Sequence, residues 1–480
     1  MHIRESIYAS LPIGLQHLAV TSQGIAYRRQ RYGGIFSQYL AALRSSEFAP
    51  AGQLLELELA EMQRMVRFAF EHVPWYRRMA RALGADWRDI RSWEDLSRLP
   101  QTTKKDVRGN SELFVADVFR AFELTPWHTS GTTGTPLTLL YEPAAVRKLW
   151  AFVELYRLQA GVSRIERRGQ FTGKVIVPGS QSPGCKIFWR YDLANRALLL
   201  STMHLAPENL PMYAAALARY RPEYLSGYPS AIYLLAQYYL AAGVTPPPLR
   251  AVLTSAETVL PHQRKAIEEG LGTRLYDQYG QTEMQSFWYQ CREGNLHVHP
   301  LAGHTEIVDA QGEPCGPGHA GSVVLTGFLN RGMPLLRYAV GDIAAWSSIA
   351  KCPCGRNMRI VARLNGRVDD FIYTQERGFV GRLDTVYKGV KHLIEAQIVQ
   401  RDVDHVLVRY VPAPAFSAQD LKTLEHNLRD RIGAAVGIEF QAVGLIPRSQ
   451  AGKFRPVISA LQELRDGCLE HAIPGPCETR

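Results

Sequence analysis

The chain has 480 residues, too many for one ordinary hydrophobic core, so two or three packed units are expected. Hydrophobic residues make up 46% and charged residues 21%, as in an ordinary globular protein, and no low-complexity tract or fixed-period repeat occurs. The formal net charge of +10 would attract an anionic partner, but no run of five Lys or Arg occurs. This scatter favours a solvated basic face over a nucleic-acid surface.

The first third of the chain predicts packing helices and no exported or membrane segment. The N-terminal twenty residues lack a clean apolar run, so no secretory signal is predicted. Apolar residues at helical spacing predict a helix over residues 54–72 and a shorter one over residues 93–99. The uncharged stretch 224–249 is apolar only over residues 231–244, which is too short to span a bilayer and suits a buried helix.

From about Leu124 onward, short apolar runs alternate with helical stretches. This alternation predicts an α/β body. Helices are expected at residues 207–220 and 230–242, and strands at residues 124–127, 251–254, 274–277, 305–308 and 322–325.

A polar, glycine-containing stretch over residues 354–366 is predicted to end this body. The pattern then restarts with strands at residues 396–399, 405–411 and 437–443 and a helix at residues 417–432. We therefore predict an α/β protein with a large multi-sheet N-terminal domain over residues 1–365. A small, mobile C-terminal α+β lid domain is predicted over residues 366–480, with a hinge near residues 366–370.

The segment richest in chemistry is a hydroxyl- and glycine-rich loop after the first predicted strand. Its glycines permit a tight turn, and its hydroxyl groups and successive backbone N–H groups can surround phosphate oxygens. It lacks the Gly-Lys-Ser/Thr ending of a P-loop and the GxGxxG spacing of a dinucleotide fold. The alternative is an ordinary surface loop. The candidate phosphate-binding residues are Ser130, Gly131, Thr132, Thr133, Gly134 and Thr135.

A second motif follows the strand predicted at residues 274–277 and reads Tyr279-Gly280-Gln281-Thr282-Glu283. An aromatic side chain beside glycine can offer a flat face to a purine. The Thr hydroxyl can meet a phosphate, and the Glu carboxylate supplies the oxygen ligand that Mg²⁺ prefers. The alternative is a strand-ending turn with a solvated glutamate.

Two single residues extend this set of candidates. Asp342 follows Gly341, and its carboxylate can accept hydrogen bonds from two ribose hydroxyls, although an Asp after Gly is usually a turn residue. Lys453 follows Gly452, so a closing domain can carry it into a cleft. There its charge would offset the negative charge that builds on the α-phosphate and the carboxylate. Otherwise it is a surface lysine.

The cysteines point to a metal rather than to disulfides. Seven cysteines in a chain of this length argue against a disulfide scaffold, and a cytoplasmic enzyme is expected. A Cys-x-Cys knuckle and an earlier Cys/His pair together make a Cys₃His set, a standard closed structural zinc site. The expected ligands are Cys291, His297, Cys352 and Cys354. His299 or Cys315 could replace His297, and the alternative is a few buried thiols beside a surface histidine.

In their order along the chain, these motifs resemble those of the adenylate-forming superfamily, which includes acyl-CoA synthetases, luciferases and peptide-synthetase adenylation domains. The Pro-x(4)-Gly-Lys spacing that ends at Lys453 is part of this resemblance. One departure is Leu137, where members often carry Lys, and another is the altered start of the motif that ends at Asp342.

The resemblance implies ATP as substrate and Mg²⁺ as cofactor. It implies that the loop at residues 130–135 binds phosphates, that Tyr279 stacks on adenine and that Asp342 binds ribose. It also implies catalytic roles for Lys453, Glu283 and Thr282. Arg367 would lie near the nucleotide, and Asp369 would be the hinge pivot.

A finer likeness, at residues 201–205, 225–230 and 394–400, is to phenylacetate–CoA ligase-like proteins, and among these to the CapK-type subgroup found with capsular polysaccharide biosynthesis. It implies that a carboxylic acid and Mg-ATP give acyl-AMP and pyrophosphate. CoA, a carrier-protein thiol or an amino-sugar acceptor then attacks the adenylate. In that branch the Cys/His pair and the later Cys-x-Cys-Gly-Arg bind zinc.

The acid itself is less well predicted. Residues 378–384 depart from the glycine-rich stretch that helps phenylacetate–CoA ligases form their acid pocket, so phenylacetate is not the expected substrate. The residues expected to line the acid pocket are Tyr228, Ser255, Ala256 and Glu257. His204 is either a pocket residue or a packed histidine.

Two other classes of function compete with this interpretation. A module could keep the fold and bind nucleotide without turnover, although the intact Glu283 and Lys453 argue against it. A nucleic-acid-binding surface would show a steep salt dependence of binding. Neither a nucleic-acid partner nor a membrane span is expected, and the sequence leaves the acid, the acceptor and the oligomeric state open.

Overall fold

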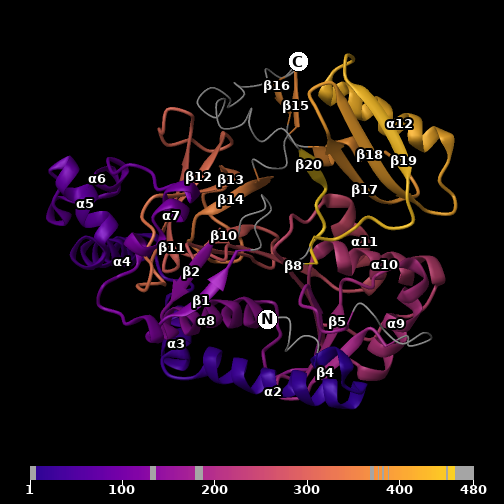
Figure 1. Ribbon diagram of the computed structural model, residues 1–480, viewed down its shortest axis with the longest axis horizontal. Coiled ribbons are helices and arrows are strands. Elements are labelled where there is room, and N and C mark those ends of the chain that lie inside the picture. The colour runs from indigo at the N-terminus through magenta and orange to yellow at the C-terminus, as the bar shows by residue number, and fades with distance from the viewer. Residues whose placement is uncertain are drawn as a thin grey trace.

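The computed structural model describes residues 7–129, 137–178, 187–367, 372–376, 378–380, 383–387, 389–449 and 452–459. The predicted α/β class is confirmed. A twelve-stranded sheet forms the body of the molecule, and a four-stranded sheet with one long helix forms a unit at the C-terminal end (Figure 1).

The strands of the large sheet are β3 (Arg168–Thr172), β4 (Trp189–Asp192), β5 (Ala197–Ser201), β6 (Tyr224–Gly227), β7 (Ala251–Ser255), β8 (Leu275–Gly280), β9 (Phe287–Gln290), β10 (Leu296–Val298), β11 (Gly303–Val308), β12 (Ala320–Gly327), β13 (Tyr338–Trp346) and β14 (Ile360–Arg367). Their order is β11-β12-β13-β14-β10-β9-β8-β7-β6-β3-β5-β4. The neighbours from β8 to β5 pair in parallel, and the other neighbours pair antiparallel.

The parallel half of the sheet sets where a ligand can bind. Its helices are α9 (Leu210–Tyr220), α10 (Pro229–Ala242) and α11 (Pro261–Leu271), preceded by the 3₁₀ helix η4 (Pro207–Asn209). They pack with these strands into one apolar cluster. The helices predicted at residues 207–220 and 230–242 are confirmed as η4 with α9 and as α10. Because the strands are parallel, the ends of β3, β5, β6, β7 and β8 meet at one edge of the sheet. Open α/β sheets bind their ligands at this carboxyl edge.

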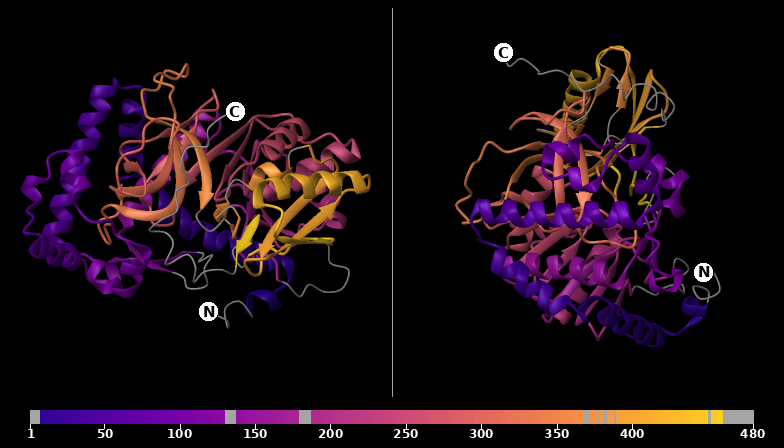
Figure 2. Two further views of the ribbon diagram at one scale, coloured as in Figure 1. Left: turned by 90° about the horizontal axis from the view of Figure 1, so that it is seen from above. Right: turned by 90° about the vertical axis from the view of Figure 1, so that its left-hand side faces the viewer.

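The helices before the sheet are α2 (Ile13–Tyr32), α3 (Phe36–Ser46), α4 (Ala51–His72), α5 (Pro74–Leu83), α6 (Trp93–Ser97), α7 (Lys104–Gly109) and α8 (Pro143–Gln159), with the 3₁₀ helices η1 (Trp87–Asp89), η2 (Ser111–Phe114) and η3 (Ala121–Glu123). The helices predicted at residues 54–72 and 93–99 are confirmed as α4 and α6. These two helices and α5 lie at the end of the molecule opposite the C-terminal unit (Figure 2).

A short hairpin, β1 (Thr125–His128) with β2 (Thr138–Tyr141), stands apart from the large sheet. β1 confirms the strand predicted at residues 124–127. The hairpin brackets the predicted phosphate loop. Among the described residues, no helix combines the length and the apolar character that crossing a bilayer requires.

The C-terminal unit contains β15 (Ile372–Thr374), β16 (Gly378–Val380), η6 (Leu383–Tyr387), β17 (Leu393–Gln400), β18 (His405–Pro412), α12 (Ala418–Ile432), β19 (Gly437–Ala442) and β20 (Val457–Ser459). These elements confirm the strands and the helix predicted after residue 390. Its main sheet has the order β19-β18-β17-β20. Leu424 and Leu428 of α12 pack on Ile398 and Val408 of that sheet and give the unit its own core.

One prediction was wrong. Residues 354–366 were described as a polar stretch with no strand, yet they contain most of β14, which pairs with β10 and β13 inside the large sheet. Ile360 and Val361 are buried there. The strand escaped prediction because its short apolar run is followed by Arg, Asn and Gly. The division of the chain at residues 365 and 366 stays a prediction, and the predicted pivot Asp369 lies outside the described residues.

Candidate active site and metal centre

The carboxyl edge of the parallel strands collects many of the predicted site residues. Tyr228 follows β6, residues 255–257 end and follow β7, and residues 279–283 end and follow β8. Asp342 reaches the end of β8 from β13 on the antiparallel side of the sheet. Residues that the sequence separates by more than a hundred positions therefore share one edge.

Two carboxylates of the predicted nucleotide pocket are held by phenols. The Tyr279 hydroxyl donates to Asp342 Oδ2 at 2.5 Å, and the Tyr338 hydroxyl donates to Glu283 Oε1 at 3.2 Å. The ring of Tyr279 packs on Trp288, with 4.1 Å between the ring centroids. The structure thus brings the aromatic and the carboxylate of two separate motifs into direct contact.

The predicted phosphate loop, residues 130–136, lies outside the described residues, but its two flanks are described. The Thr129 N–H donates to the Leu137 carbonyl, and the Leu137 N–H donates to Thr129 Oγ1, both at 2.9 Å. From the same hairpin, the Tyr141 hydroxyl donates to the carbonyl of Thr282. The base of the loop is therefore joined to the motif at residues 279–283.

Glu257, predicted to line the acid pocket, anchors two backbone segments. Its Oε2 accepts from the Ser230 N–H at 3.1 Å, and its Oε1 accepts from the Phe454 N–H at 2.7 Å. Burial raises the pKa of Glu257, although these hydrogen bonds favour its charged form. Burial, together with the nearby Glu257 charge, raises the pKa of Tyr228 to about 12. The C-terminal segment is thus tied to the large sheet.

The segment that carries Lys453 lies against the same edge. The Lys453 carbonyl accepts from the Ser449 N–H at 2.9 Å, which closes a tight turn. Gly452 in this turn has φ of +71°, and a Cβ there would lie 2.7 Å from the Gly173 Cα and would also clash with Thr202. Only glycine fits this approach. Gly173 follows β3 and Thr202 follows β5, so Lys453 stands beside the ends of the parallel strands.

A buried ion pair, which the sequence did not predict, fixes the other side of this segment. Arg448 Nη2 lies 2.7 Å from Glu395 Oε1, and the two side chains are only 5% and 3% exposed. The Arg448 guanidinium also stacks over the Phe454 ring at 5.0 Å. Burial raises the pKa of Glu395, and the Arg448 charge opposes this rise. The pair attaches the Lys453 segment to β17 of the C-terminal unit.

Two other predicted residues, Arg367 and His204, have few described contacts with the rest of the site. Arg367 pairs through its backbone with Asp342 across β13 and β14, and its side chain is not described. His204 is packed against Phe188 and hydrogen-bonds Ser201 Oγ at 2.9 Å, which favours the packed histidine over a pocket residue.

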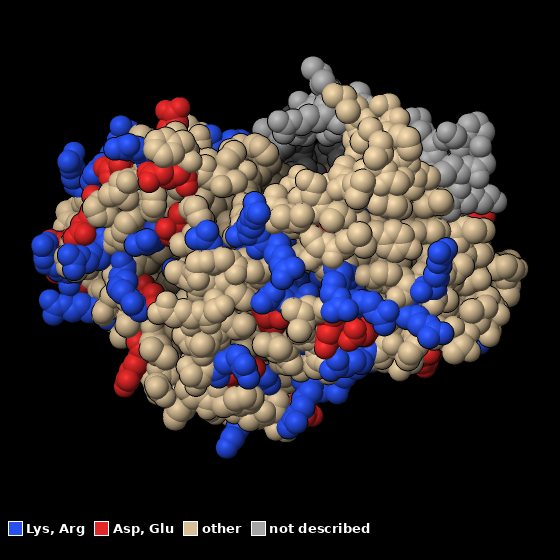
Figure 3. All heavy atoms as spheres, turned by 90° about the horizontal axis from the view of Figure 1, so that it is seen from below, with Lys and Arg blue, Asp and Glu red and all other residues tan. Residues whose placement is uncertain are grey.

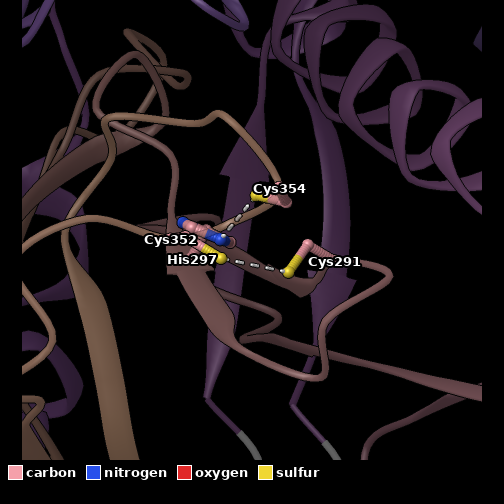
Figure 4. A group of neighbouring side chains, drawn as sticks. All are labelled: Cys291, His297, Cys352 and Cys354. Atoms are coloured by element: carbon pink, nitrogen blue, oxygen red, sulfur yellow. Dashed lines mark hydrogen bonds between the residues drawn. The ribbon is translucent and has the colours of Figure 1, made fainter.

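The four predicted zinc ligands come together in one buried cluster (Figure 4). Cys291 directly follows β9, His297 lies on β10, and Cys352 and Cys354 lie in the loop before β14. The ligand atoms all lie within 4.8 Å of one another. Neither His299 nor Cys315 belongs to the cluster. His299 packs against Phe152 instead, so His297 completes the set among the described residues.

The geometry of the cluster fits a tetrahedral zinc ion. Zn–S bonds of about 2.3 Å in a tetrahedron place two sulfurs about 3.8 Å apart. The Sγ atoms of Cys291 and Cys352 are 3.7 Å apart, and Cys354 Sγ lies 3.4 Å from His297 Nε2. Burial lowers the pKa of His297 to about 4, which keeps its imidazole neutral, as a ligand must be.

Neighbouring groups orient these ligands. The Asn295 amide donates to Cys352 Sγ at 3.1 Å, and the Glu293 N–H donates to Cys291 Sγ at 3.4 Å. His297 Nδ1 faces the Met358 carbonyl at 3.4 Å, which directs Nε2 toward the sulfurs. Support of this kind is typical of metal sites.

Comparison with known proteins shows which proteins the chain resembles. Residues 372–460 match the family of CapK C-terminal domains. The chain is 27% identical to protein CapK of Staphylococcus aureus over 464 residues, which covers 95% of this chain and 99% of that protein. It is also 27% identical over 451 residues to phenylacetate–coenzyme A ligase of Thermus thermophilus, which covers 86% of this chain and 98% of that protein.

Among solved structures, a 2-hydroxyisobutyryl-CoA ligase in its postadenylation state, bound to R3-HIB-AMP, has the same fold. The TM-score is 0.68 at 22% identity, and the match covers 89% of this chain and 94% of the ligase. Over most of its length the chain is therefore similar to CapK and to phenylacetate–CoA ligases of the adenylate-forming superfamily, and its C-terminal unit matches the CapK C-terminal family.

Proposed function

We propose that the protein activates a carboxylic acid with ATP as the acyl-AMP and then transfers the acyl group to a thiol of the CoA kind. In the first step, a carboxylate oxygen attacks the α-phosphorus, the α–β phosphoanhydride bond breaks and pyrophosphate leaves. In the second step, the thiol attacks the acyl carbon and AMP leaves. The observation that supports this most is the docking of the Lys453 segment on the sheet edge that carries residues 279–283.

The nucleotide is proposed to bind between the end of β8 and β13. One face of Tyr279 packs on Trp288, and we propose that its opposite face takes the adenine. Asp342, buried beside it, would accept hydrogen bonds from the ribose hydroxyls. Gly280 and Gln281 directly follow Tyr279 and would lie beside the adenine. Thr282 is joined to the β1–β2 hairpin that brackets residues 130–136, so the phosphates would lie between Thr282 and this hairpin.

Two charged residues are proposed to act on the reacting groups. The half-buried Glu283 offers carboxylate oxygen at the phosphate side of the pocket, and this fits a Mg²⁺ ion that would neutralise phosphate charge when bound. Lys453 would stabilise the negative charge on the α-phosphate and the attacking carboxylate. The acid is proposed to lie near Tyr228, Ser255 and Ala256.

The acceptor step requires the Lys453 segment to leave the sheet edge. The hydrogen bond from Phe454 to Glu257 and the packing of Gly452 on Thr202 join the two parts of the molecule, so rotation of the C-terminal unit breaks both. The buried pair of Arg448 and Glu395 lies inside the C-terminal unit and moves with it. For the acceptor itself, two alternatives to CoA are also proposed: a carrier-protein thiol, or an amino sugar in polysaccharide modification.

The Cys₃His cluster is proposed to hold a structural Zn²⁺. Four protein ligands leave no open position for water, so the ion would not take part in the reaction. It would tie the β9–β10 hairpin to the loop before β14 and so stiffen the antiparallel half of the sheet behind Tyr279.

The proposed activity is tested by ATP–pyrophosphate exchange over a panel of carboxylic acids. We expect exchange with at least one acid. With Lys453→Ala, we expect a loss of about a hundredfold or more, because a charge that acts on the transition state is removed. Lys422→Ala, which changes an exposed lysine of α12, is the matched control and is expected to exchange at the wild-type rate.

Two results would count against the proposal. If ATP binds but no acid supports exchange, the chain is a nucleotide-binding module without turnover. If Lys453→Ala and Lys422→Ala exchange equally fast, Lys453 has no role in adenylation.

A further inference from the structure

Helix α2 presents three large apolar side chains to solvent. Leu15, Leu18 and Ile25 lie at helical spacing along its outer side and are between 44% and 59% exposed. Its buried residues are Gln16 and Gly24, while Val20 and Tyr32 are half-buried. An ordinary surface helix buries its large apolar side chains, so the exposure of these three is unusual.

Polar contacts explain how this helix is held. Gln16 Oε1 accepts from Arg190 Nε at 2.7 Å, and Thr21 Oγ1 accepts from the Leu193 N–H at 3.2 Å. The Asn195 amide donates to the Gly24 carbonyl at 3.0 Å. All three partners belong to β4, the edge strand of the large sheet, or to the turn that follows it. The helix is thus fastened through its polar side, and its apolar side is left facing outward.

The surface around this apolar stripe is basic. Residues 6–46 contain no Asp or Glu, and their basic residues include Arg28, Arg29, Arg31 and Arg44. Arg28 and Arg29 are exposed at the C-terminal end of α2. Viewed from below, the face along which α2 runs carries more Lys and Arg than Asp and Glu across its middle (Figure 3).

Exposed apolar side chains extend the stripe beyond the helix. Leu193 lies in the turn beside Thr21, is hydrogen-bonded to it and is strongly exposed. Val175 is also strongly exposed, and it follows Lys174, which donates to the Tyr27 hydroxyl of α2 at 2.8 Å. We define the α2 surface as Leu15, Leu18 and Ile25 with Leu193, Val175 and the flanking Arg28 and Arg29.

We propose that the α2 surface binds an anionic lipid bilayer, with α2 lying in the plane of the headgroups. A helix with exposed Leu and Ile beside arginines has the chemistry of an interfacial helix, in which the apolar side chains enter the acyl boundary and the cations pair with lipid phosphates. A second copy of the chain fits less well. Residues 6–46 carry no Asp or Glu that a second copy could set against Arg28 and Arg29.

The proposal is tested by co-sedimentation of the full-length protein with vesicles. We expect binding to vesicles of phosphatidylglycerol and phosphatidylcholine, and weaker binding to phosphatidylcholine alone. The combined Leu15→Ser, Leu18→Ser and Ile25→Ser variant is expected to lower the partition coefficient about tenfold or more, because three apolar side chains no longer enter the bilayer.

A matched control changes three apolar residues outside the α2 surface. Leu83→Ser, Phe122→Ser and Ile349→Ser alter side chains that are between 46% and 80% exposed, and this variant is expected to bind vesicles like the wild type. If the apolar variant fails to fold, Arg28→Gln with Arg29→Gln is the second test. It should remove the preference for phosphatidylglycerol, since these arginines are exposed and the change leaves the apolar stripe intact.

Three results would overturn the proposal. The wild type could fail to bind either kind of vesicle, or the two apolar variants could lose binding equally. Sedimentation could also show a wild-type dimer that the α2 variant dissociates while neither protein binds vesicles, and the α2 surface would then be an interface between copies.

Discussion

The proposed nucleotide pocket depends on pairs of side chains that lie far apart in the sequence. Tyr279 and Asp342 are 63 positions apart, and Glu283 and Tyr338 are 55 positions apart. Each carboxylate was predicted as a ligand from its motif, whereas Tyr338 was not predicted, because no local pattern marks a phenol that closes on a distant strand. A hydrogen-bonded carboxylate is held in place before the nucleotide arrives, which lowers the cost of ordering it on binding.

Substitution at Asp342 separates nucleotide binding from the rest of the site. With Asp342→Ala we expect KM for ATP in pyrophosphate exchange to rise at least about tenfold. Two hydrogen bonds from ribose hydroxyls to a charged acceptor, each worth about 1.5–3 kcal/mol, would be lost. Tyr279→Phe keeps the ring and removes only the hydroxyl, so a rise of about threefold or less is expected. An unchanged KM in Asp342→Ala would remove Asp342 from the nucleotide site.

Glu257 has a contact that its sequence neighbours do not indicate. It was predicted to line the acid pocket, which stays a prediction, and both its carboxylate oxygens accept backbone N–H groups, one of them from Phe454. Because nearly two hundred positions separate these residues, only the folded chain reveals the contact.

At the scale of secondary structure, strands and helices with a clear period were predicted well. α4, α6, α10, α12 and the strands β17, β18 and β19 lie close to where hydrophobic spacing placed them, whereas β15, β16 and β20 were not predicted. α2 escaped prediction because its apolar residues lie on both sides of the helix: Leu15 and Leu18 are exposed, whereas Val20 and Tyr32 are half-buried, so no apolar stripe marks it. β14 escaped because four of its eight residues are Arg, Asn or Gly, and because it is completed by pairing with neighbouring strands.

The Cys₃His cluster joins elements that the sequence could only pair by residue type. Its members were predicted as zinc ligands from cysteine and histidine spacing, but their meeting depends on the pairing of β10 with β9 and β14. That pairing, which spacing alone does not give, excludes His299 and Cys315 from the cluster.

Loss of one zinc ligand should release metal and weaken this half of the sheet. For the purified wild type we expect about one zinc ion per chain by elemental analysis, since the cluster offers four ligands for one tetrahedral ion. In Cys352→Ser we expect most of the metal to be lost and the melting temperature to fall by about 5 °C or more. Cys315→Ser, a cysteine outside the cluster, is the control and should keep both values. Equal zinc contents in the two variants would contradict a metal site at Cys352.

At the scale of the whole molecule, the sequence predicted the two-part α/β fold but not the order of the twelve strands. That order decides which loops meet, because it places the ends of β3, β5, β6, β7 and β8 along one edge. Motif order along the chain gave no information on this edge. It also gave no sign that the C-terminal segment would seat Gly452 on Gly173 and Thr202, a contact that depends on how the two units of the fold pack together.

The proposed chemistry requires the Lys453 segment to lie against this edge while the acid is adenylated. Gly452→Ala tests this requirement. A Cβ at residue 452 meets the backbone of Gly173, whereas a Cβ at Gly444, after β19, meets nothing, so Gly444→Ala is the matched control. With an acid from the exchange panel, we predict that Gly452→Ala lowers pyrophosphate exchange about tenfold or more. It should still transfer the acyl group from synthetic acyl-AMP to CoA, and Gly444→Ala should perform both steps normally. Exchange at the wild-type rate in Gly452→Ala would contradict the account.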